Sequence, residues 1–299
     1  MRRSRRGAAS TIILILVFLA GLSLLLYPTL SDYWNSLHQS RAITEYAEQV
    51  AGLDNDVYEQ LWAEARSYNQ TLLGKTDRYE MTDEERAEYE SLLDVSGNGI
   101  IGYIEIKKIG CSLPIYHGTD EAVLQIAVGH IEGTSLPVGG ESTHAVISGH
   151  RGLPSARLFT DLDQLAEGDT FVLRILDETL TYEVDQIRIV EPQEIGELEI
   201  VEGEDYCTLV TCTPYGINTH RLLVRGHRVE NAAAASAVRV TADAMQIEPV
   251  IVAPLVAVPM LLLLLIGLLA STHRKKRQRI KMERNMEYGS GGNDDEETL

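Results

Sequence analysis

After the N-terminal apolar run, hydrophobic and polar residues alternate with the period of an α-helix as far as about residue 93. Residues 33–93 place apolar side chains at three- and four-residue intervals, as in YWNSLHQSRAITEYAEQVAGL and DVYEQLWAEARSYNQTLL, which predicts helices with one apolar face. The polar stretch 74–85 breaks this pattern. MTDEERAEYESLL then predicts a short helix with Thr82 as N-cap and Glu85 three residues later. We therefore expect a helical region over 31–98, with a loop at 74–85.

From Gly99 onward the pattern changes to that of β-strands. The segments GIIGYIEIKKI, CSLPIYHG, HAVISGH, DTFVLRIL, ETLTYEVDQIRIV, DYCTLVTC and HRLLVRGHRVE are rich in β-branched and aromatic residues, with Gly, Pro, Asp and Asn between them. So many short strands predict a mainly β fold over 99–230, a closed or nearly closed barrel of about eight strands. Two short helices are expected to interrupt it, near 121–127 and near 155–165.

A continuous apolar run near the N-terminus predicts a transmembrane helix over 11–30. Thr11 to Leu26 reads TIILILVFLAGLSLLL, and with its flanks it approaches the ~20 residues needed to cross a bilayer. Four arginines within 1–10 predict that this end stays in the cytoplasm. No clear small-residue cleavage site follows, so we expect a retained anchor rather than a cleaved signal peptide.

A second apolar run, VIVAPLVAVPMLLLLLIGLLA, predicts another transmembrane helix over 250–270. The basic run HRKKRQR follows it and predicts a cytoplasmic tail over 271–299. The alanine-rich segment 231–249 is typical of a linker. Two spans with both termini inside place the region between them outside the cell, as expected for a two-pass cell-membrane protein.

The negative net charge of the chain limits which classes of molecule it can bind. The formal net charge is −18, and residues 7–272 alone hold 15 basic and 38 acidic residues. A surface this acidic repels phosphate backbones, so no nucleic acid partner is expected. The same surface suits a cationic partner, such as a substrate that offers a lysine amine.

Three cysteines, an odd number, leave at least one thiol unpaired in a domain expected outside the cell. Cys212 ends the apolar strand TLVTC, just before the turn TPYG. Alternation along a strand puts it on one face with Thr208 and Val210, and puts Cys207 on the other. We therefore interpret Cys212 as a candidate nucleophile, and Cys207 and Cys111 as buried hydrophobic side chains.

A proton-transfer partner for this thiol would be a histidine at a strand end. His150 closes the strand HAVISGH, whereas His144 begins it, roughly 20 Å away at ~3.3 Å per residue. His144 and His150 therefore cannot both belong to one catalytic site. His117, His130 and His220 stay open as alternatives.

A cation beside the thiol would favour the thiolate and bind an oxyanion. Arg221 and Arg225 share a face of the segment THRLLVRGHR. A hairpin through TPYGINT would bring Arg221 next to Cys212, although a plain surface arginine is an equally open interpretation. No cofactor is expected, and no metal-binding cluster is visible in the sequence.

Together, TLVTC at 208–212, an arginine nine residues later and a histidine about sixty residues earlier resemble the sortase signature. The longer run TLVTCTPYGINTHRLLVRG, with GYIEIKKI, LPIYHGT and SGHRGLPSARLFTDLDQL, resembles the class C, pilin-polymerising sortases. The resemblance covers about Gly99 to Glu230. It implies a sortase-type β-barrel, and a C-terminal anchor is common in that class.

The resemblance also implies roles. Cys212 would attack the Thr–Gly bond of an LPxTG-like sorting signal and form a thioacyl enzyme. His150 would be the acid and base, and Arg221 would hold the substrate backbone and the oxyanion. A lysine amine of a pilin subunit would resolve the intermediate. The implied partners are pilin subunits and other surface proteins with LPxTG-like signals, on a Gram-positive cell surface.

Class C sortases usually carry a lid with an Asp-Pro-aromatic motif, and here the loop 74–85 offers Asp77-Arg78-Tyr79. By resemblance, Asp77 would pair with Arg221 and Tyr79 would stack over Cys212. The missing proline predicts a less rigid loop, and an ordinary interhelix loop is the alternative.

Three other functions are compatible with the same sequence features. A housekeeping sortase would anchor proteins to cell-wall peptide, but it needs neither a lid nor a second span. A thiol hydrolase would pass the acyl group to water. A membrane-tethered binding barrel would merely bury its cysteine, and replacing Cys212 by alanine would leave its binding intact.

Overall fold

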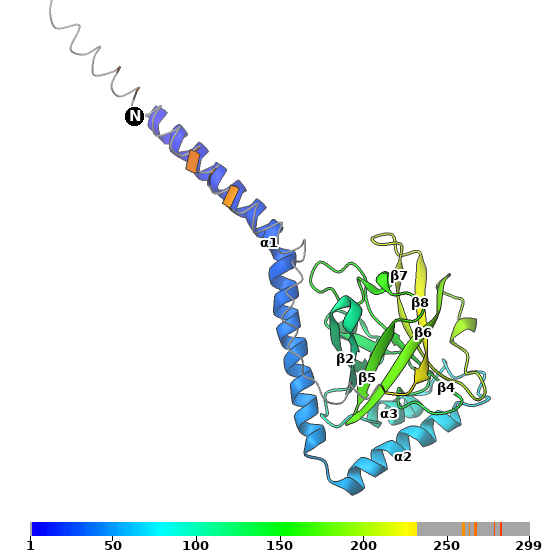
Figure 1. Cartoon of the computed structure of the whole chain (residues 1–299). Coiled ribbons are helices and arrows are strands. Elements are labelled where there is room, and N and C mark those ends of the chain that lie inside the picture. Colours follow the sequence, from blue (N-terminus) through cyan, green and yellow to red (C-terminus); the bar gives the residue numbers. More distant parts are fainter. Residues whose placement is uncertain are drawn as a thin grey trace, which may run out of the picture. The chain divides into compact units, whose positions relative to one another are not determined.

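The computed structural model describes residues 2–231, with scattered residues between 259 and 282. It comprises two compact units, of which Leu30–Thr241 contains the barrel (Figure 1). The helix α1 (Arg2–Ala51) contains, from Ile12 onward, a stretch with a mean hydropathy of 2.5 that is long and apolar enough to cross a membrane. It is the one such helix within the described residues. The predicted span 250–270 lies almost entirely outside them, as do the linker and the tail.

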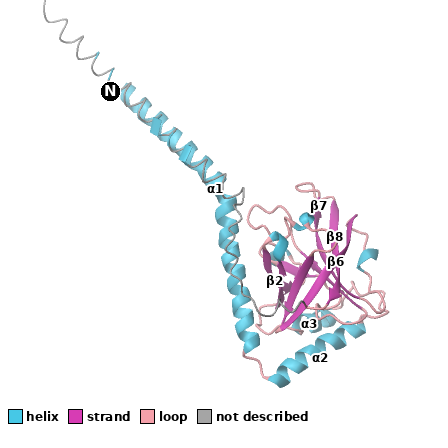
Figure 2. Ribbon diagram, in the orientation of Figure 1, coloured by secondary structure: helices cyan, strands magenta, loops and turns pink. Residues whose placement is uncertain are grey.

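Eight strands form the closed barrel that the alternating pattern predicts (Figure 2). They are β1 (Ile100–Ile106), β2 (Cys111–His117), β3 (Val128–His130), β4 (Thr143–Ser148), β5 (Thr170–Ile175), β6 (Glu178–Val190), β7 (Asp205–Thr213) and β8 (His220–Val229). Their order around the barrel is β1-β2-β3-β4-β7-β8-β6-β5. The pairs β2/β3 and β4/β7 are parallel, and the other pairs are antiparallel. The parallel pairs join strands through long connections, and β4/β7 brings together segments about sixty residues apart.

The N-terminal helices follow the apolar periodicity. The helix α2 is Asn55–Thr71 and α3 is Asp83–Ser91. The helix α3 begins with a capping box in which the Thr82 hydroxyl accepts from the Glu85 amide and the Glu85 carboxylate accepts from the Thr82 amide. The predicted N-cap is therefore confirmed.

Of the two short helices predicted within the barrel, one is present as α4 (Glu121–Leu124). The helix predicted near 155–165 is wrong: this segment consists of turns and a short 3-10 element, η2 (Leu162–Gln164). Leu158 has φ +41°, outside the right-handed helical region, and the Arg157 amide donates to the Asp32 carboxylate at 2.8 Å rather than within a helix. An outside partner thus replaces the helical hydrogen bond.

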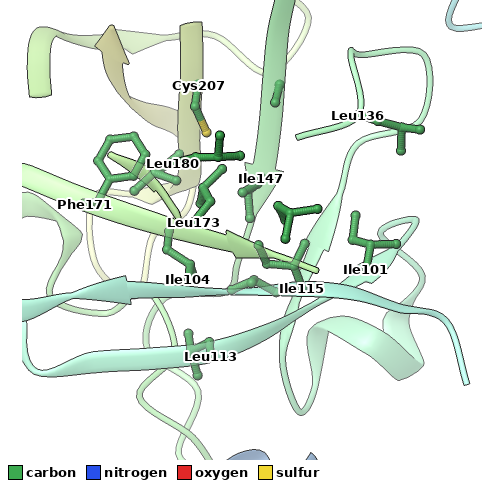
Figure 3. Packing of buried hydrophobic residues seen from close by; sticks show 14 of the residues in the cluster. Ile101, Ile104, Leu113, Ile115, Leu136, Ile147, Phe171, Leu173, Leu180 and Cys207 are labelled. Atoms are coloured by element: carbon green, nitrogen blue, oxygen red, sulfur yellow. The ribbon is translucent and has the colours of Figure 1, made fainter. Parts of the chain in front are cut away.

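Alternation along β7 separates a barrel-core face from an outer face. Cys207 and Leu209 are fully buried inside the barrel, where Cys207 lies near Phe171 and Leu180 (Figure 3). Residues at even positions, including Cys212, therefore point to the outer face. Cys207 is a buried core side chain, as predicted, whereas Cys111, at the start of β2, is only half-buried.

Two buried histidines, His130 and His144, hydrogen-bond the strands of the barrel to the segments that pack against it. His130 Nδ1 lies 2.8 Å from the Tyr89 hydroxyl of α3, and its Nε2 lies 2.8 Å from the Ser135 carbonyl. His144 Nδ1 lies 2.8 Å from the Glu199 carbonyl, and its Nε2 lies 2.7 Å from the Thr208 hydroxyl. Burial lowers the pKa of each histidine to about 4. Both are therefore neutral in the folded protein at neutral pH.

This burial predicts a loss of stability in mild acid. The unfolded chain takes up protons on both histidines below about pH 6.5, whereas the folded chain does so only near pH 4. The free energy of unfolding should therefore fall by about 2 kcal/mol per histidine between pH 7 and pH 5. Urea unfolding at several pH values measures this. The variant His144→Gln should reduce this fall by about 2 kcal/mol. A wild-type stability that is constant over this range would contradict the account.

Candidate functional site

The outer face of three neighbouring strands carries a small apolar cluster of its own. Val146 of β4, Val210 of β7 and Leu223 of β8 are buried there. Leu198, from the β6–β7 connection, packs over them. Because residues i and i+2 share a face of a strand, the row through Val210 continues to Cys212. The candidate site thus lies at one end of an apolar floor that a connection covers in part.

Cys212 and Arg221 are direct partners in the antiparallel β7/β8 ladder, as the predicted hairpin requires. The Arg221 guanidinium donates to the His220 carbonyl at 3.2 Å, and within residues 2–231 no carboxylate pairs with it. Arg225, by contrast, makes a bidentate pair with Asp185 at 2.9 and 3.0 Å. Of the two candidate arginines, Arg221 is therefore the one beside the thiol and available to an anionic ligand.

His150 follows β4 by two residues, on a segment held against β7. Ser148 pairs with Val210, the Gly149 amide donates to the Val210 carbonyl at 3.0 Å, and the Thr211 hydroxyl donates to the Gly149 carbonyl at 2.7 Å. Extending the parallel register by two residues brings His150 alongside Cys212. The pairing of β4 with β7 thus brings the two predicted residues to neighbouring positions along the backbone.

The His150 imidazole is 28% exposed, so a substrate can reach it. Its Nε2 lies 4.0 Å from Oε2 of Glu121 on α4. Sequence reasoning did not find Glu121, because nothing in the spacing relates a short helix near residue 121 to a strand end near residue 150.

The other candidate histidines are less suited than His150 to exchange protons with a substrate at Cys212. His130 and His144 are buried and use both ring nitrogens, and His117 buries both of its ring nitrogens beside Tyr89. His220 pairs with Thr213, and alternation along β8 turns it away from the face of Arg221. Within the part of the chain that the structure describes, no group of three or more His, Cys, Asp and Glu side chains is placed to hold a metal ion.

Arg151, next to His150, contacts the end of β7, the strand that carries Cys212. Its guanidinium forms an ion pair with Asp163, donates to the Thr213 hydroxyl at 3.4 Å and lies 5.9 Å from the Tyr215 ring centroid. The side chain is only 9% exposed. Sequence reasoning missed it, since its contacts with Thr213 and Tyr215 depend on the β4/β7 pairing.

The predicted lid segment docks through its central residue. Arg78 is buried and donates to the Leu198 carbonyl, the Glu199 carboxylate and the Tyr79 hydroxyl at 3.1, 3.1 and 3.0 Å. Asp77 is exposed, and within the described residues no hydrogen bond or ion pair joins it to Arg221. The contact expected at Asp77 is therefore absent from this structure, and Arg78 makes the anchoring contacts. The lid role of Asp77 and Tyr79 stays a prediction.

Gly133 lets this segment approach closely. A Cβ at Gly133 would lie 2.2 Å from the Arg78 carbonyl oxygen, and its φ of +79° favours glycine. The Asp77-Arg78-Tyr79 segment is thus fitted against the β3–β4 connection as well as against Leu198.

The three thiols should differ sharply in reactivity. Burial raises the pKa of Cys111 to about 12 and raises that of Cys207 well above its usual range, so both are almost entirely protonated at neutral pH. Iodoacetamide at pH 7.5 should therefore modify one thiol of the folded chain, Cys212, and all three after denaturation. Peptide mapping by mass spectrometry measures this. Labelling of Cys111 as fast as Cys212 would contradict the assignment.

Comparison with known proteins agrees with this geometry. The Sortase domain family matches residues 104–229. The crystal structure of sortase C1 from Streptococcus agalactiae is 54% identical, with a TM-score of 0.62, and covers 64% of this chain and 100% of that chain. Sortase C from Streptococcus pneumoniae is 46% identical, with a TM-score of 0.58, over 64% of this chain and 98% of that one.

Among curated relatives, sortase D of Bacillus subtilis is 31% identical over 131 residues. The alignment spans 43% of this chain and 63% of that relative's length. The match of the family model, residues 104–229, lies in the barrel, where the candidate site is. The chain belongs to the sortase family, and its solved structural neighbours include class C sortases.

Proposed function

We propose that this chain is a membrane-anchored cysteine transpeptidase that joins pilin subunits. Its substrates are surface proteins with an LPxTG-like sorting signal, cleaved between Thr and Gly. The acceptor is a lysine amine of another pilin subunit. The observation that carries this proposal is the cross-strand pair of Cys212 and Arg221, with the His150 segment hydrogen-bonded alongside.

In the first step, the Cys212 thiolate attacks the threonine carbonyl carbon, and the carbonyl oxygen becomes an oxyanion beside Arg221. As the C–N bond to glycine breaks, His150 gives its proton to the departing amine. The products are a thioester on Cys212 and a free glycine amine.

In the second step, the lysine amine attacks the thioester carbonyl carbon. Neutral His150 takes the proton from this amine, and the Cys212 thiolate leaves. The result is an isopeptide bond, with thiolate and protonated imidazole restored. The apolar floor of Val146, Val210 and Leu223 is buried under Leu198, so a peptide that approaches Cys212 would reach it only after that connection moves.

The helix α1 anchors the barrel on the outer side of the cell membrane. Its apolar stretch from Ile12 is long enough to span the bilayer, and the arginines before it keep the N-terminus inside. The predicted second span over 250–270 would make the protein two-pass, with both termini in the cytoplasm. The sorting-signal proteins would then meet the barrel at the cell surface.

A competition between acceptors tests the proposal. The full chain in detergent receives an LPxTG-type peptide together with two amines, a pilin-derived lysine peptide and a cell-wall-type peptide amine. We expect isopeptide-linked product with the lysine peptide in excess over the other product and over hydrolysis. Product with the wall-type amine alone would favour the housekeeping alternative, and product with water alone would favour a hydrolase.

The Asp77-Arg78-Tyr79 segment is a lid over Leu198 and the apolar floor, and Arg78 fastens it. This is supported by the contacts of Arg78 with Leu198 and Glu199, because Leu198 packs on the apolar floor next to Cys212. If the Arg78 guanidinium lost its contacts with Leu198 and Glu199, Tyr79 could move away and a peptide could reach the apolar floor.

Arg78→Ala is therefore expected to speed the formation of the acyl enzyme several-fold. Single-turnover mass spectrometry with the sorting-signal peptide measures it. Arg41→Ala, which removes an exposed arginine paired with Glu45, is the control and should leave the rate unchanged. A folded Arg78→Ala protein that is no faster than wild type would contradict a lid.

A further inference from the structure

A stripe of four apolar side chains on α1 is exposed. Leu30, Tyr33, Trp34 and Leu37 have exposed fractions of 61, 63, 64 and 48%. Their spacing of three and four residues places them on one face of the helix. We call them the outer stripe. Exposed apolar patches on a folded domain usually mark a surface that another apolar phase or a partner covers.

The barrel is bound to the opposite face of the same helical turns. The Asn35 amide donates to the Ser155 carbonyl at 2.8 Å, and the Asp32 carboxylate accepts from the Arg157 amide at 2.8 Å. One turn later the Gln39 amide donates to the Ile126 carbonyl at 2.7 Å. At about 100° per residue, these three polar residues lie roughly 180° from the centre of the outer stripe. Over residues 30–39 the helix therefore presents a polar face to the barrel and an apolar face away from it.

The position of the outer stripe along the chain indicates what covers it. It begins a few residues after the apolar run that ends at Leu26, on the same helix. A span of ~20 residues from Thr11 ends near Leu30, so the stripe comes at the depth of the lipid head groups. Tyrosine and tryptophan are enriched at that depth, because their rings are apolar with one polar end.

We propose that the outer stripe lies in the head-group layer of the membrane and that the barrel is held on the watery side of the same helical turns. This rests on the membrane anchoring proposed above and not on the catalytic role of Cys212. Asp32 and Asn35 contact the segment that follows His150. This segment is tied back to His150, because the His150 carbonyl accepts a hydrogen bond from the Phe159 amide at 3.1 Å. The stripe thereby fixes that segment near the membrane surface, where a membrane-borne substrate would be met.

The two tryptophans of the chain allow a direct test. The variant Trp62→Phe leaves Trp34 as the single tryptophan, and Trp34→Phe leaves the buried Trp62 as the matched control. Each full-length variant is reconstituted into phosphatidylcholine vesicles whose lipids carry bromine either near the head group or near the end of the acyl chain. Bromine quenches tryptophan fluorescence on contact.

We expect Trp34 to be quenched several-fold more by bromine near the head group than by deep bromine, and Trp62 to be quenched by neither. Stronger quenching by deep bromine would overturn the inference, because the stripe would then belong to the span itself. Absence of quenching in vesicles that retain the protein would also overturn the inference. The outer stripe would then face water, the 250–270 segment or another protein instead of lipid. Failure of the chain to remain with the vesicles would refute the anchoring as well.

Discussion

Replacement of Cys212 by alanine is expected to abolish product formation, a loss of about 10⁴-fold or more. The reason is that no other thiol can take over. Cys207 is fully buried in the barrel core, and burial raises the pKa of Cys111 to about 12. The measurement is the rate of ligation of an LPxTG-type peptide to a lysine amine by the full chain.

Cys111→Ala is the matched control for this loss, because it also removes one sulfur atom. It should keep most of the wild-type rate. Binding of the sorting-signal peptide should survive in Cys212→Ala, since the apolar floor is unchanged. Ligation that persists without Cys212 would exclude the thiol mechanism, whereas ligation absent from the wild type as well would favour a binding module.

Arg221→Gln is expected to lower kcat about 10²–10³-fold, with a smaller change in KM. Arg221 is the cross-strand partner of Cys212, and within the described residues no carboxylate competes for its guanidinium. An interaction made mainly with the oxyanion is strongest in the transition state, so its loss should appear in kcat. Steady-state kinetics with the same peptide and amine give both constants.

Arg225→Gln is the comparison, since it removes the same charge from the same face of β8. Its bidentate pair with Asp185 gives it a structural role, so the variant should lower the free energy of unfolding more than it lowers kcat. Equal losses of kcat in the two variants would mean that general positive charge, rather than the position of Arg221, is what matters.

The barrel was predictable because its strands carry their own signal. Alternation identified seven segments that became strands, and the odd spacing between Cys207 and Cys212 correctly put them on opposite faces. β3 was not predicted, since Val128–His130 is too short for a two-residue period to be read. The segment 155–165 was wrongly assigned, because its decisive hydrogen bond goes to Asp32 on α1, far away in the sequence.

The site was predictable only in part, for a similar reason. Cys212 and Arg221 face each other across a local hairpin, so spacing sufficed to bring them together. His150 is joined to them by the parallel pairing of β4 with β7, a contact between distant segments. Leu198, which covers the floor, comes from a connection whose packing no pattern indicates.

The lid segment gives a third case. The resemblance drew attention to Asp77 and Tyr79, and the residue between them was read only as a missing proline. In the structure Arg78 is buried and makes three hydrogen bonds. A buried arginine is not expected from a polar loop, because charged side chains are seldom buried without partners and its partners at 198–199 lie 120 residues away.

The most direct test of the central claim is the mass of the intact full chain after reaction with an LPxTG-type peptide without an acceptor amine. The account predicts an increase equal to the peptide up to its threonine, mapped to Cys212, absent from Cys212→Ala and reversed by hydroxylamine. No adduct on the wild type or on Arg78→Ala, across several signal variants, would contradict it, as would an adduct on Cys111.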